Sequence, residues 1–219
     1  MTVGGSIPKN TFKRIRSRGS IMIRMQKSDR RTLHQEPHTR LIQKAQKGDL
    51  DAFGAIFEMT KLRVYRVAFG ILQNRESAND AVQESFVRLY RGLKNLDPER
   101  PLFTYLYKIT VNACFDLLKK WRPDQKVTLE SGRHFTEPSA NPSSTLESQE
   151  QLDVLRKLAA RLSPHQCAVF FLRHLEDLEL PEIVTVLGWH PATVRSQLHF
   201  ARRRMKQWLE KEYPEFLED

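Results

Sequence analysis

Residues 176–205, EDLELPEIVTVLGWHPATVRSQLHFARRRM, contain the pattern that decides the fold of this chain. A short segment from Pro181 to Leu187 is periodic in apolar residues and stops at Gly188, the residue type that most often ends a helix. Pro191 then opens a second segment, and proline is favoured at the first position of a helix. Two helices joined by so tight a turn predict a helix-turn-helix motif.

The second helix of this motif has two faces of different character. Its buried face is predicted by apolar residues at intervals of three and four, namely Val194, Leu198, Ala201 and Met205. Its outer face carries Thr193, Arg195, Ser196, Gln197, His199, Arg202 and Arg203. A helix fits the major groove of DNA, and such side chains pair with base edges or phosphates. The alternative is a solvated face of an ordinary bundle; the absence of acidic residues from Arg195 to Lys206 favours DNA.

Composition excludes several other classes of protein. The chain has 219 residues, 40% of them hydrophobic, and its longest apolar stretches are far shorter than the roughly 20 residues that cross a bilayer. Cys114 and Cys167 are its only cysteines and show no metal-ligand spacing, so neither a disulfide scaffold nor a zinc site is indicated. We therefore expect a cytoplasmic globular protein.

The net charge of +10 is distributed unevenly. Residues 1–40 contribute +8 and residues 41–122 contribute +5, whereas residues 123–147 contribute −2. A basic cluster follows from Arg195 to Lys206, and residues 210–219 form an acidic tail. This distribution predicts binding to a polyanion, most simply a nucleic acid.

Residues 1–40 are basic, poor in large apolar residues and broken by glycine and proline, which predicts disorder. The same composition also fits a mitochondrial transit peptide. A third interpretation is that translation starts at Met22 or Met25, and that the extension is not part of the protein.

Residues 41–122 have the period of three helices around one core. Apolar spacing predicts the first helix from Leu41, and a second begins at Ser77, where Ser77 and Asp80 resemble a capping pair. Gly92 ends the second helix, and a proline-containing loop leads to a third that starts at Leu102.

Residues 123–147 lose this period and read as a flexible linker rich in proline and serine. Residues 148–209 show four further helical patterns, one of them opened by the capping box Ser163 to Gln166. No strand signal is present in the sequence. The chain is thus predicted to be all-α, with two small helical domains joined by a linker.

This layout resembles the extracytoplasmic-function, or group IV, sigma factors of bacterial RNA polymerase over about residues 41–208. ANDAVQESFVRLYR at 78–91 is similar to the region 2 helix of that family, and LYKITVNACFDLLKKWR at 106–122 to its minus-10 recognition helix. Residues 176–205 resemble its region 4 helix-turn-helix, which reads the minus-35 element. Four positions depart from the usual pattern, where Leu102, Tyr105, Glu179 and Val184 replace Phe, Trp, Ser and a small residue.

The resemblance implies an alternative sigma factor that binds core RNA polymerase, through the clamp helices of the largest subunit and through the flap. Asp80, Gln83 and Glu84 match the positions that grip the clamp helices. The minus-10 element would be bound by Lys94, Asn95, Arg100, Tyr105, Lys108, Asn112, Lys119, Lys120 and Arg122, with Tyr107 as the alternative stacking residue. The minus-35 element would be bound by the outer face of the last helix defined above.

Two further expectations follow from the family. The linker would run through the RNA channel, with Asp124, Glu130 and Glu137 imitating nucleic-acid charge, or would be a passive tether. An anti-sigma factor would control the protein.

Three rival functions stay open at this point. A stand-alone helix-turn-helix regulator leaves Asp80, Gln83 and Glu84 unexplained, and an RNA-binding scaffold fits the charge alone. An enzyme is disfavoured, because the sequence has no HExxH motif, phosphate loop or nucleophile elbow. His34 and His38 lie four residues apart, but in a segment predicted to be disordered. No catalytic residue, metal or cofactor is therefore predicted.

Overall fold

The computed structural model describes residues 37–121, 154–155 and 157–214. In these parts of the chain every regular element is a helix: α1 (Pro37–Gln46), α2 (Leu50–Leu72), α3 (Arg75–Gly92), the 3-10 helix η2 (Leu93–Asn95), α4 (Leu102–Trp121), α6 (Pro164–His174), α7 (Leu180–Leu187) and α8 (Pro191–Glu212). Residues 154–155 and 157–159 are also helical. None of the described helices is long and apolar enough to cross a membrane.

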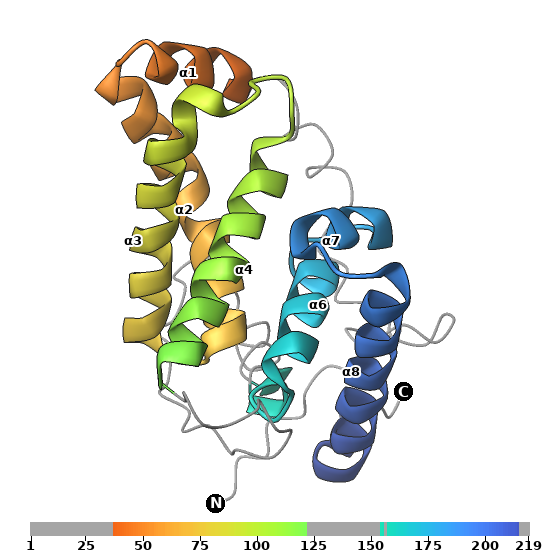
Figure 1. Cartoon of the computed structure of the whole chain (residues 1–219). Helices are drawn as coiled ribbons and strands as arrows, with labels where there is room; N and C mark the ends of the chain where they lie inside the picture. Colours follow the sequence, from red (N-terminus) through yellow and green to blue (C-terminus); the bar gives the residue numbers. More distant parts are fainter. Residues whose placement is uncertain (1–36, 122–153, 156, 215–219) are drawn as a thin grey trace, which may run out of the picture.

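Helices α2, α3 and α4 form a three-helix bundle, and α1 lies across one end of it (Figure 1). The core of this bundle is apolar, with Ile56, Leu89 and Leu106 inaccessible to solvent. Leu102 and Ala113, which lie on the inner side of α4, are buried as well. Burial of such stripes supplies most of the stability of helices that would be marginal in water.

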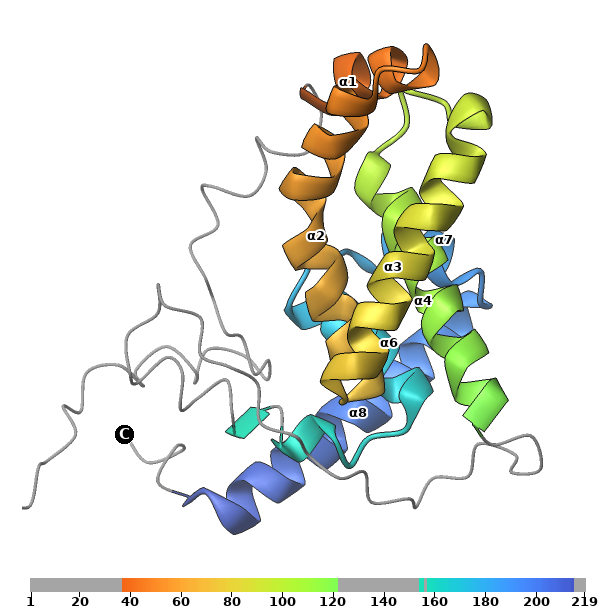
Figure 2. The ribbon, with the colours of Figure 1, turned by 90° about the vertical axis from the view of Figure 1, so that its left-hand side faces the viewer.

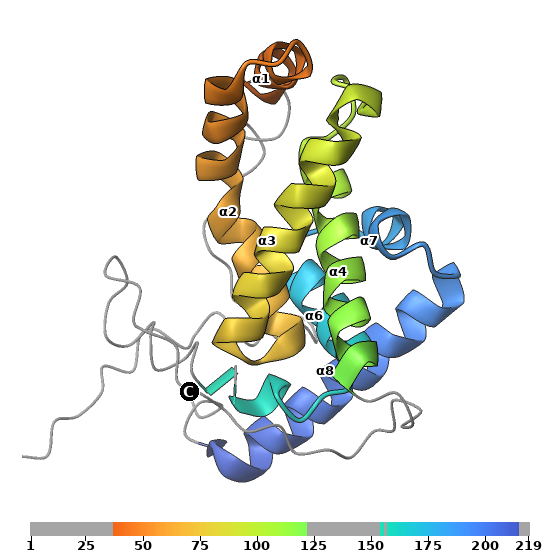
Figure 3. The ribbon, with the colours of Figure 1, turned by 60° about the vertical axis from the view of Figure 1, so that its left-hand side comes forward.

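Helices α6, α7 and α8 form the second group and pack beside the bundle (Figure 2). The predicted inner face of the last helix is confirmed, because Val194, Leu198, Ala201 and Met205 are all buried. Figure 3 shows α8 running obliquely past the lower ends of α4 and α6. The two groups share one cluster of buried residues, which the sequence did not reveal.

Most of the predicted helix ends are confirmed. Ser163 caps α6, its Oγ accepting a hydrogen bond from the backbone N–H of Gln166, and Pro164 follows it. Gly188 ends α7 at φ +65°, a left-handed conformation that glycine adopts without strain. Pro191 opens α8, which runs on to Glu212, into the segment predicted as a tail.

Two predicted starts are wrong. The helix predicted from Leu41 is two helices in the structure, α1 from Pro37 and α2 from Leu50, with Gly48 at φ +94° in the turn between them. Helix α3 is capped by Asn74 and not by Ser77, since the Asn74 Oδ1 accepts hydrogen bonds from both the N–H and the hydroxyl of Ser77. The amide competes successfully because α2 and α3 are separated by only two residues, which leaves Ser77 inside the first turn.

Several predictions fall outside the described residues. They are the segment 1–36 with its start sites, the linker 123–147 with its acidic residues, Arg122, and the end of the acidic tail from 215.

Candidate functional site

The exposed face of α3 carries the residues expected to bind polymerase. Asp80 and Gln83 are exposed, and Glu84 is partly so. The Arg88 guanidinium donates to Glu84 at 2.7 Å and to Asp116 on α4 at 3.0 Å. The hydrogen bond to Glu84, together with smaller contributions from Asp116, raises the pKa of Arg88 despite its partial burial. This face therefore presents an acidic and amide surface on which Arg88 of α3 holds the Glu84 carboxylate and is itself tied to α4 through Asp116.

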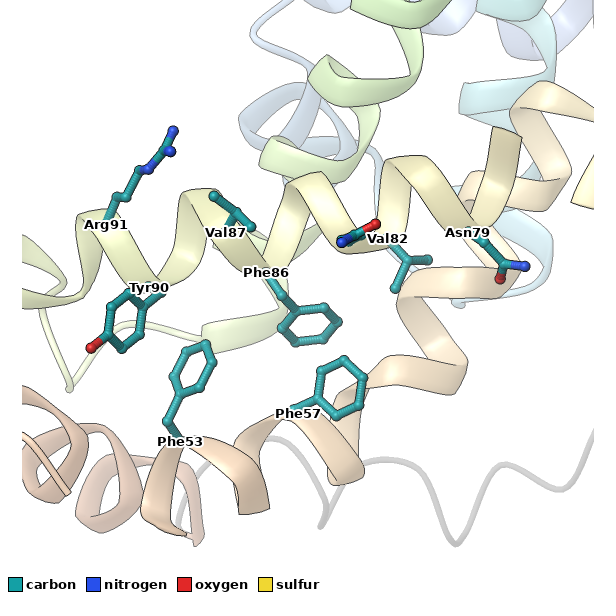
Figure 4. Close-up of a pocket in the computed structure, with 9 residues that line it drawn as sticks. Phe53, Phe57, Asn79, Val82, Phe86, Val87, Tyr90 and Arg91 are labelled. Atoms are coloured by element: carbon teal, nitrogen blue, oxygen red, sulfur yellow. The ribbon is translucent and has the colours of Figure 1, made fainter. Parts of the chain in front are cut away.

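An apolar groove of about 480 Å³ lies beside that surface, between α2 and α3. Figure 4 shows Phe53 and Phe57 of α2 opposite Phe86 and Tyr90 of α3. The rings of Phe57 and Phe86 meet edge to face with centroids 4.6 Å apart. Its other lining residues are Asn79, Val82, Gln83, Val87 and Arg91. An apolar floor with a polar rim is the usual anatomy of a protein interface.

The loop from η2 to α4 is held by α1. One Gln46 amide donates to the carbonyls of Leu93 and Leu96, at 2.9 and 2.7 Å. The Thr39 hydroxyl donates to the carbonyl of Pro98 at 3.1 Å. Sequence reasoning missed both residues, because a polar side chain on a surface helix carries no signal of a partner some 50 residues away. The predicted DNA-binding residues of the loop, Lys94, Asn95 and Arg100, are all exposed.

Helix α4 presents a polar face next to this loop. Lys108, Asn112, Lys119 and Lys120 are exposed, and Tyr105 is partly buried. The alternative prediction, that Tyr107 stacks on a base, is wrong. Its side chain is fully buried, and its hydroxyl donates a hydrogen bond to the Glu176 carboxylate. Burial, reinforced by the Glu176 charge, raises the pKa of Tyr107 well above its ordinary value.

The outer face of α8 is largely free in the described structure. Thr193, Arg195, Ser196, His199 and Arg203 are exposed, whereas Gln197 and Arg202 are partly buried. The positive end of the α8 dipole lies at the start of this face, at a place where phosphate would be favoured. Arg202 differs from the other cations, because its Nε donates to the Nε2 of His174 on α6.

The structure brings the predicted minus-10 helix against the turn of the helix-turn-helix. Phe115 of α4 stacks on His165, with ring centroids 4.9 Å apart, and lies 6.0 Å from the ring of Trp189. Partial burial lowers the pKa of His165. None of these three residues was predicted as a functional residue.

Comparison with known proteins agrees with this geometry. Residues 56–122 match the family Sigma-70 region 2, and residues 152–205 match Sigma-70, region 4, so the two matches together span more than half of the chain. The chain therefore belongs to the sigma-70 family.

Its relatives place it more narrowly. It is 27% identical over 176 residues to the ECF RNA polymerase sigma factor SigW of Bacillus subtilis, covering 77% of this chain and 94% of SigW. It is 26% identical over 186 residues to the RNA polymerase sigma-H factor of Pseudomonas aeruginosa, covering 81% of this chain and 96% of that protein. The chain is an extracytoplasmic-function sigma factor, an alternative subunit that directs core RNA polymerase to its promoters.

Two solved structures share the fold. CnrH in complex with the cytosolic domain of CnrY has a TM-score of 0.56 and 22% identity, covering 80% of this chain and 98% of CnrH. The sigma factor RpoE in complex with the anti-sigma factor NepR, from Bartonella quintana, has a TM-score of 0.57 and 18% identity, covering 73% of this chain and 98% of RpoE.

Proposed function

We propose that three exposed surfaces divide the work of transcription initiation. The observation behind this assignment is that region 2 and region 4 follow each other in this order along one chain. The first surface is the face of α3 with Asp80, Gln83 and Glu84, which binds the clamp helices of the polymerase largest subunit. Its support is the exposure of these side chains beside the apolar groove, which Gln83 itself lines.

The second surface binds the minus-10 element as it melts. Lys94, Asn95 and Arg100 form a pocket for a flipped base, and Tyr105 stacks on it. Lys108, Lys119, Lys120 and Arg122 hold the phosphates of the exposed strand, while Asn112 hydrogen-bonds a base. Its support is the exposure of all of these cations within the described residues and the bracing of the loop by α1.

The third surface is the outer face of α8, which binds the minus-35 element in the major groove. Arg195 and Ser196 contact bases, while Arg202 and Arg203 hold the backbone. The exposure of Thr193, Arg195 and Ser196 in the first turns of the helix supports this arrangement, because these turns enter the groove in helix-turn-helix proteins.

The rest of the chain connects and regulates these surfaces. Region 2 occupies about residues 41–122, and region 4 occupies about residues 148–209. The linker between them passes through the RNA channel of the polymerase. Region 4 contacts the flap of the polymerase. An anti-sigma factor silences the protein. The support for this is that RpoE, a sigma factor with the same fold, forms a complex with the anti-sigma factor NepR. The protein acts in the cytoplasm with its polymerase and has no catalytic activity of its own.

Run-off transcription tests this function. The purified full chain is added to bacterial core polymerase, with DNA from its own genomic neighbourhood as template. Discrete transcripts that core alone does not produce are expected, and Glu84→Gln should reduce them through weaker core binding. The matched control is Glu58→Gln, which removes an exposed carboxylate on α2 that pairs with Lys61 within the same helix. No transcript and no association with core would instead indicate a stand-alone regulator.

A further inference from the structure

The two sigma regions of this chain are packed on each other rather than held apart. Helix α2 lies against α6, and α4 lies against α7 (Figure 1). Val67 and Tyr107 of region 2 belong to the same buried cluster as Leu172 and Ile183 of region 4. Separating the regions would expose these apolar side chains to water, which is unfavourable in proportion to their area.

A buried carboxylate lies at the centre of this contact. Glu176 follows α6 in region 4, and only 4% of it is exposed. It accepts a hydrogen bond from Arg63 at 2.8 Å and another from the Tyr107 hydroxyl, both in region 2. Arg66 of α2 approaches its other oxygen to 3.3 Å. All three of these partners lie across the interface.

The pairing of the Glu176 carboxylate with cations therefore depends on the closed arrangement. A buried carboxylate that loses its cations carries a desolvation penalty of several kcal/mol, whereas an exposed one is solvated by water. Because Arg63, Arg66 and Tyr107 all belong to region 2, opening the interface would separate Glu176 from all of them.

The contact between α2 and α6 also depends on a glycine. A Cβ atom placed on Gly70 of α2 would lie 2.6 Å from the Cγ atom of Phe171 on α6. Real Cβ atoms essentially never come so near to another heavy atom. Helices α2 and α6 can therefore meet in this way only because residue 70 has no side chain.

The closed arrangement cannot match a promoter. Elements centred at minus 10 and minus 35 lie about 25 base pairs apart, or roughly 85 Å along B-DNA. Phe115 and Trp189 are in contact, with ring centroids 6.0 Å apart. Asn112 is one helical turn from Phe115, and Thr193 is four residues from Trp189, so these two DNA-binding positions are no more than roughly 35 Å apart.

We propose that Glu176 is an intramolecular latch, which holds region 4 on region 2 in the free protein and opposes engagement of both promoter elements. In the closed form Glu176 is bound by Arg63, Arg66 and Tyr107. The absence of a side chain at Gly70 allows α2 to approach Phe171 on α6 closely enough for these contacts to form. This inference rests on the proposed function, since the closed form opposes activity only if both DNA surfaces are used together.

Two independent variants should open the latch. Gly70→Ala adds a methyl group that the interface cannot hold, and it leaves α2 intact because alanine is the better helix former. Gly54→Ala is the matched control, since it lies in the same helix and an added Cβ would meet nothing within 4 Å. Glu176→Gln removes the charge but keeps the size of the side chain, and Glu58→Gln is its control on the exposed surface of α2.

The first readout is energy transfer within the free chain. Donor and acceptor dyes are attached after Glu76→Cys and Lys157→Cys, at one exposed position in each region, and circular dichroism confirms that each variant is helical. We expect Gly70→Ala and Glu176→Gln to lose at least half of the transfer that the parent and both controls show. Equal transfer in all five chains would overturn the latch, and loss in Gly70→Ala alone would overturn the role of Glu176.

The second readout is the chain concentration that gives half-maximal run-off transcription with core polymerase. If the closed form makes up more than four-fifths of the free protein, opening it should lower this concentration by about fivefold or more. An unchanged concentration in a chain whose transfer has fallen would overturn the claim that closure opposes activity. A parent chain that directs no transcription would refute the proposed function instead. The energy-transfer measurement would still test whether Glu176 holds the two regions together, because it does not depend on transcription.

Discussion

The Nε of Arg202 donates a hydrogen bond to the Nε2 of His174 at 3.2 Å, which joins the outer face of α8 to the last turn of α6. The imidazole can accept this bond only when it is neutral. Burial, together with the charges of Arg202 and Arg173, lowers the pKa of His174 to about 3. Burial also lowers the pKa of Arg202, with a smaller contribution from Arg173. The recognition helix is thus attached to the domain by a histidine that stays unprotonated.

This histidine should make the protein sensitive to acid. An unfolded histidine has a pKa near 6.5, so between pH 6.5 and 3 the unfolded chain binds a proton that folded His174 does not. The free energy of unfolding should therefore fall as the pH falls through this window, by up to about 1.4 kcal/mol per unit from this group. Urea denaturation between pH 7 and 4 measures it. His174→Gln should flatten the dependence, and His199→Gln, at an exposed position, should not; identical slopes in all three chains would contradict the assignment.

Arg195 and Arg203 should differ in what they contribute to DNA binding. If Arg195 contacts a base, Arg195→Ala should cost about 1 to 3 kcal/mol on the matched minus-35 site and relax specificity. If Arg203 contacts a phosphate, Arg203→Ala should weaken binding to matched and scrambled duplexes alike and lower the salt slope by about one. Fluorescence anisotropy at several salt concentrations separates the two effects. Equal, sequence-independent losses in both variants would refute this division.

Gln46 should matter to promoter melting without touching DNA. Gln46→Ala removes two hydrogen bonds that hold the loop before α4, so we expect the free energy of unfolding to fall by about 1 to 2 kcal/mol. Initiation on duplex promoters should fall more than initiation on templates that are already melted at the minus-10 element. Gln43→Ala is the control, because Gln43 lies on the same helix and is exposed. A loss of the same size on both templates would show that the loop is not used in melting.

The two cysteines should be chemically inert in the folded protein. Both are buried, burial raises the pKa of Cys114, and the Cys167 thiol donates to the carbonyl of Ala159. A thiolate is the reactive species, so a disulfide reagent should modify neither residue at pH 8 until the chain is unfolded. Time-resolved absorbance in native buffer and in denaturant measures this. Rapid modification of the native protein would contradict this prediction.

The elements of this fold could be predicted because their signals are local. The capping box from Ser163 to Gln166 and the left-handed Gly188 depend on a few neighbouring residues, and the inner face of α8 depends only on helical period. The start of α3 was misplaced because Asn74 and Ser77 are both capping residues. The short turn after α2 decided between them.

The candidate site divides in the same way. Exposed residues such as Asp80 and Arg195 were predicted correctly as surface residues, because a polar side chain on the outer stripe of an amphipathic helix faces solvent. The partial burial of Arg202 and the full burial of Tyr107 were not predicted, because the sequence does not place their partners, His174 at the end of α6 and Glu176 just after it. Their burial depends on contacts with residues far away along the chain.

The sequence by itself determined most of the helices, their two groupings and the family of the protein, because periodicity, caps and motif order are written within short stretches. Only the tertiary structure decided that the two regions close on each other. Glu176 and Tyr107 are 69 residues apart, and Glu176 reads as a surface charge in its own segment. The burial of Glu176 follows from the close approach of α2 to α6 at Gly70. A steric fit between two helices leaves no pattern in the sequence of either helix alone.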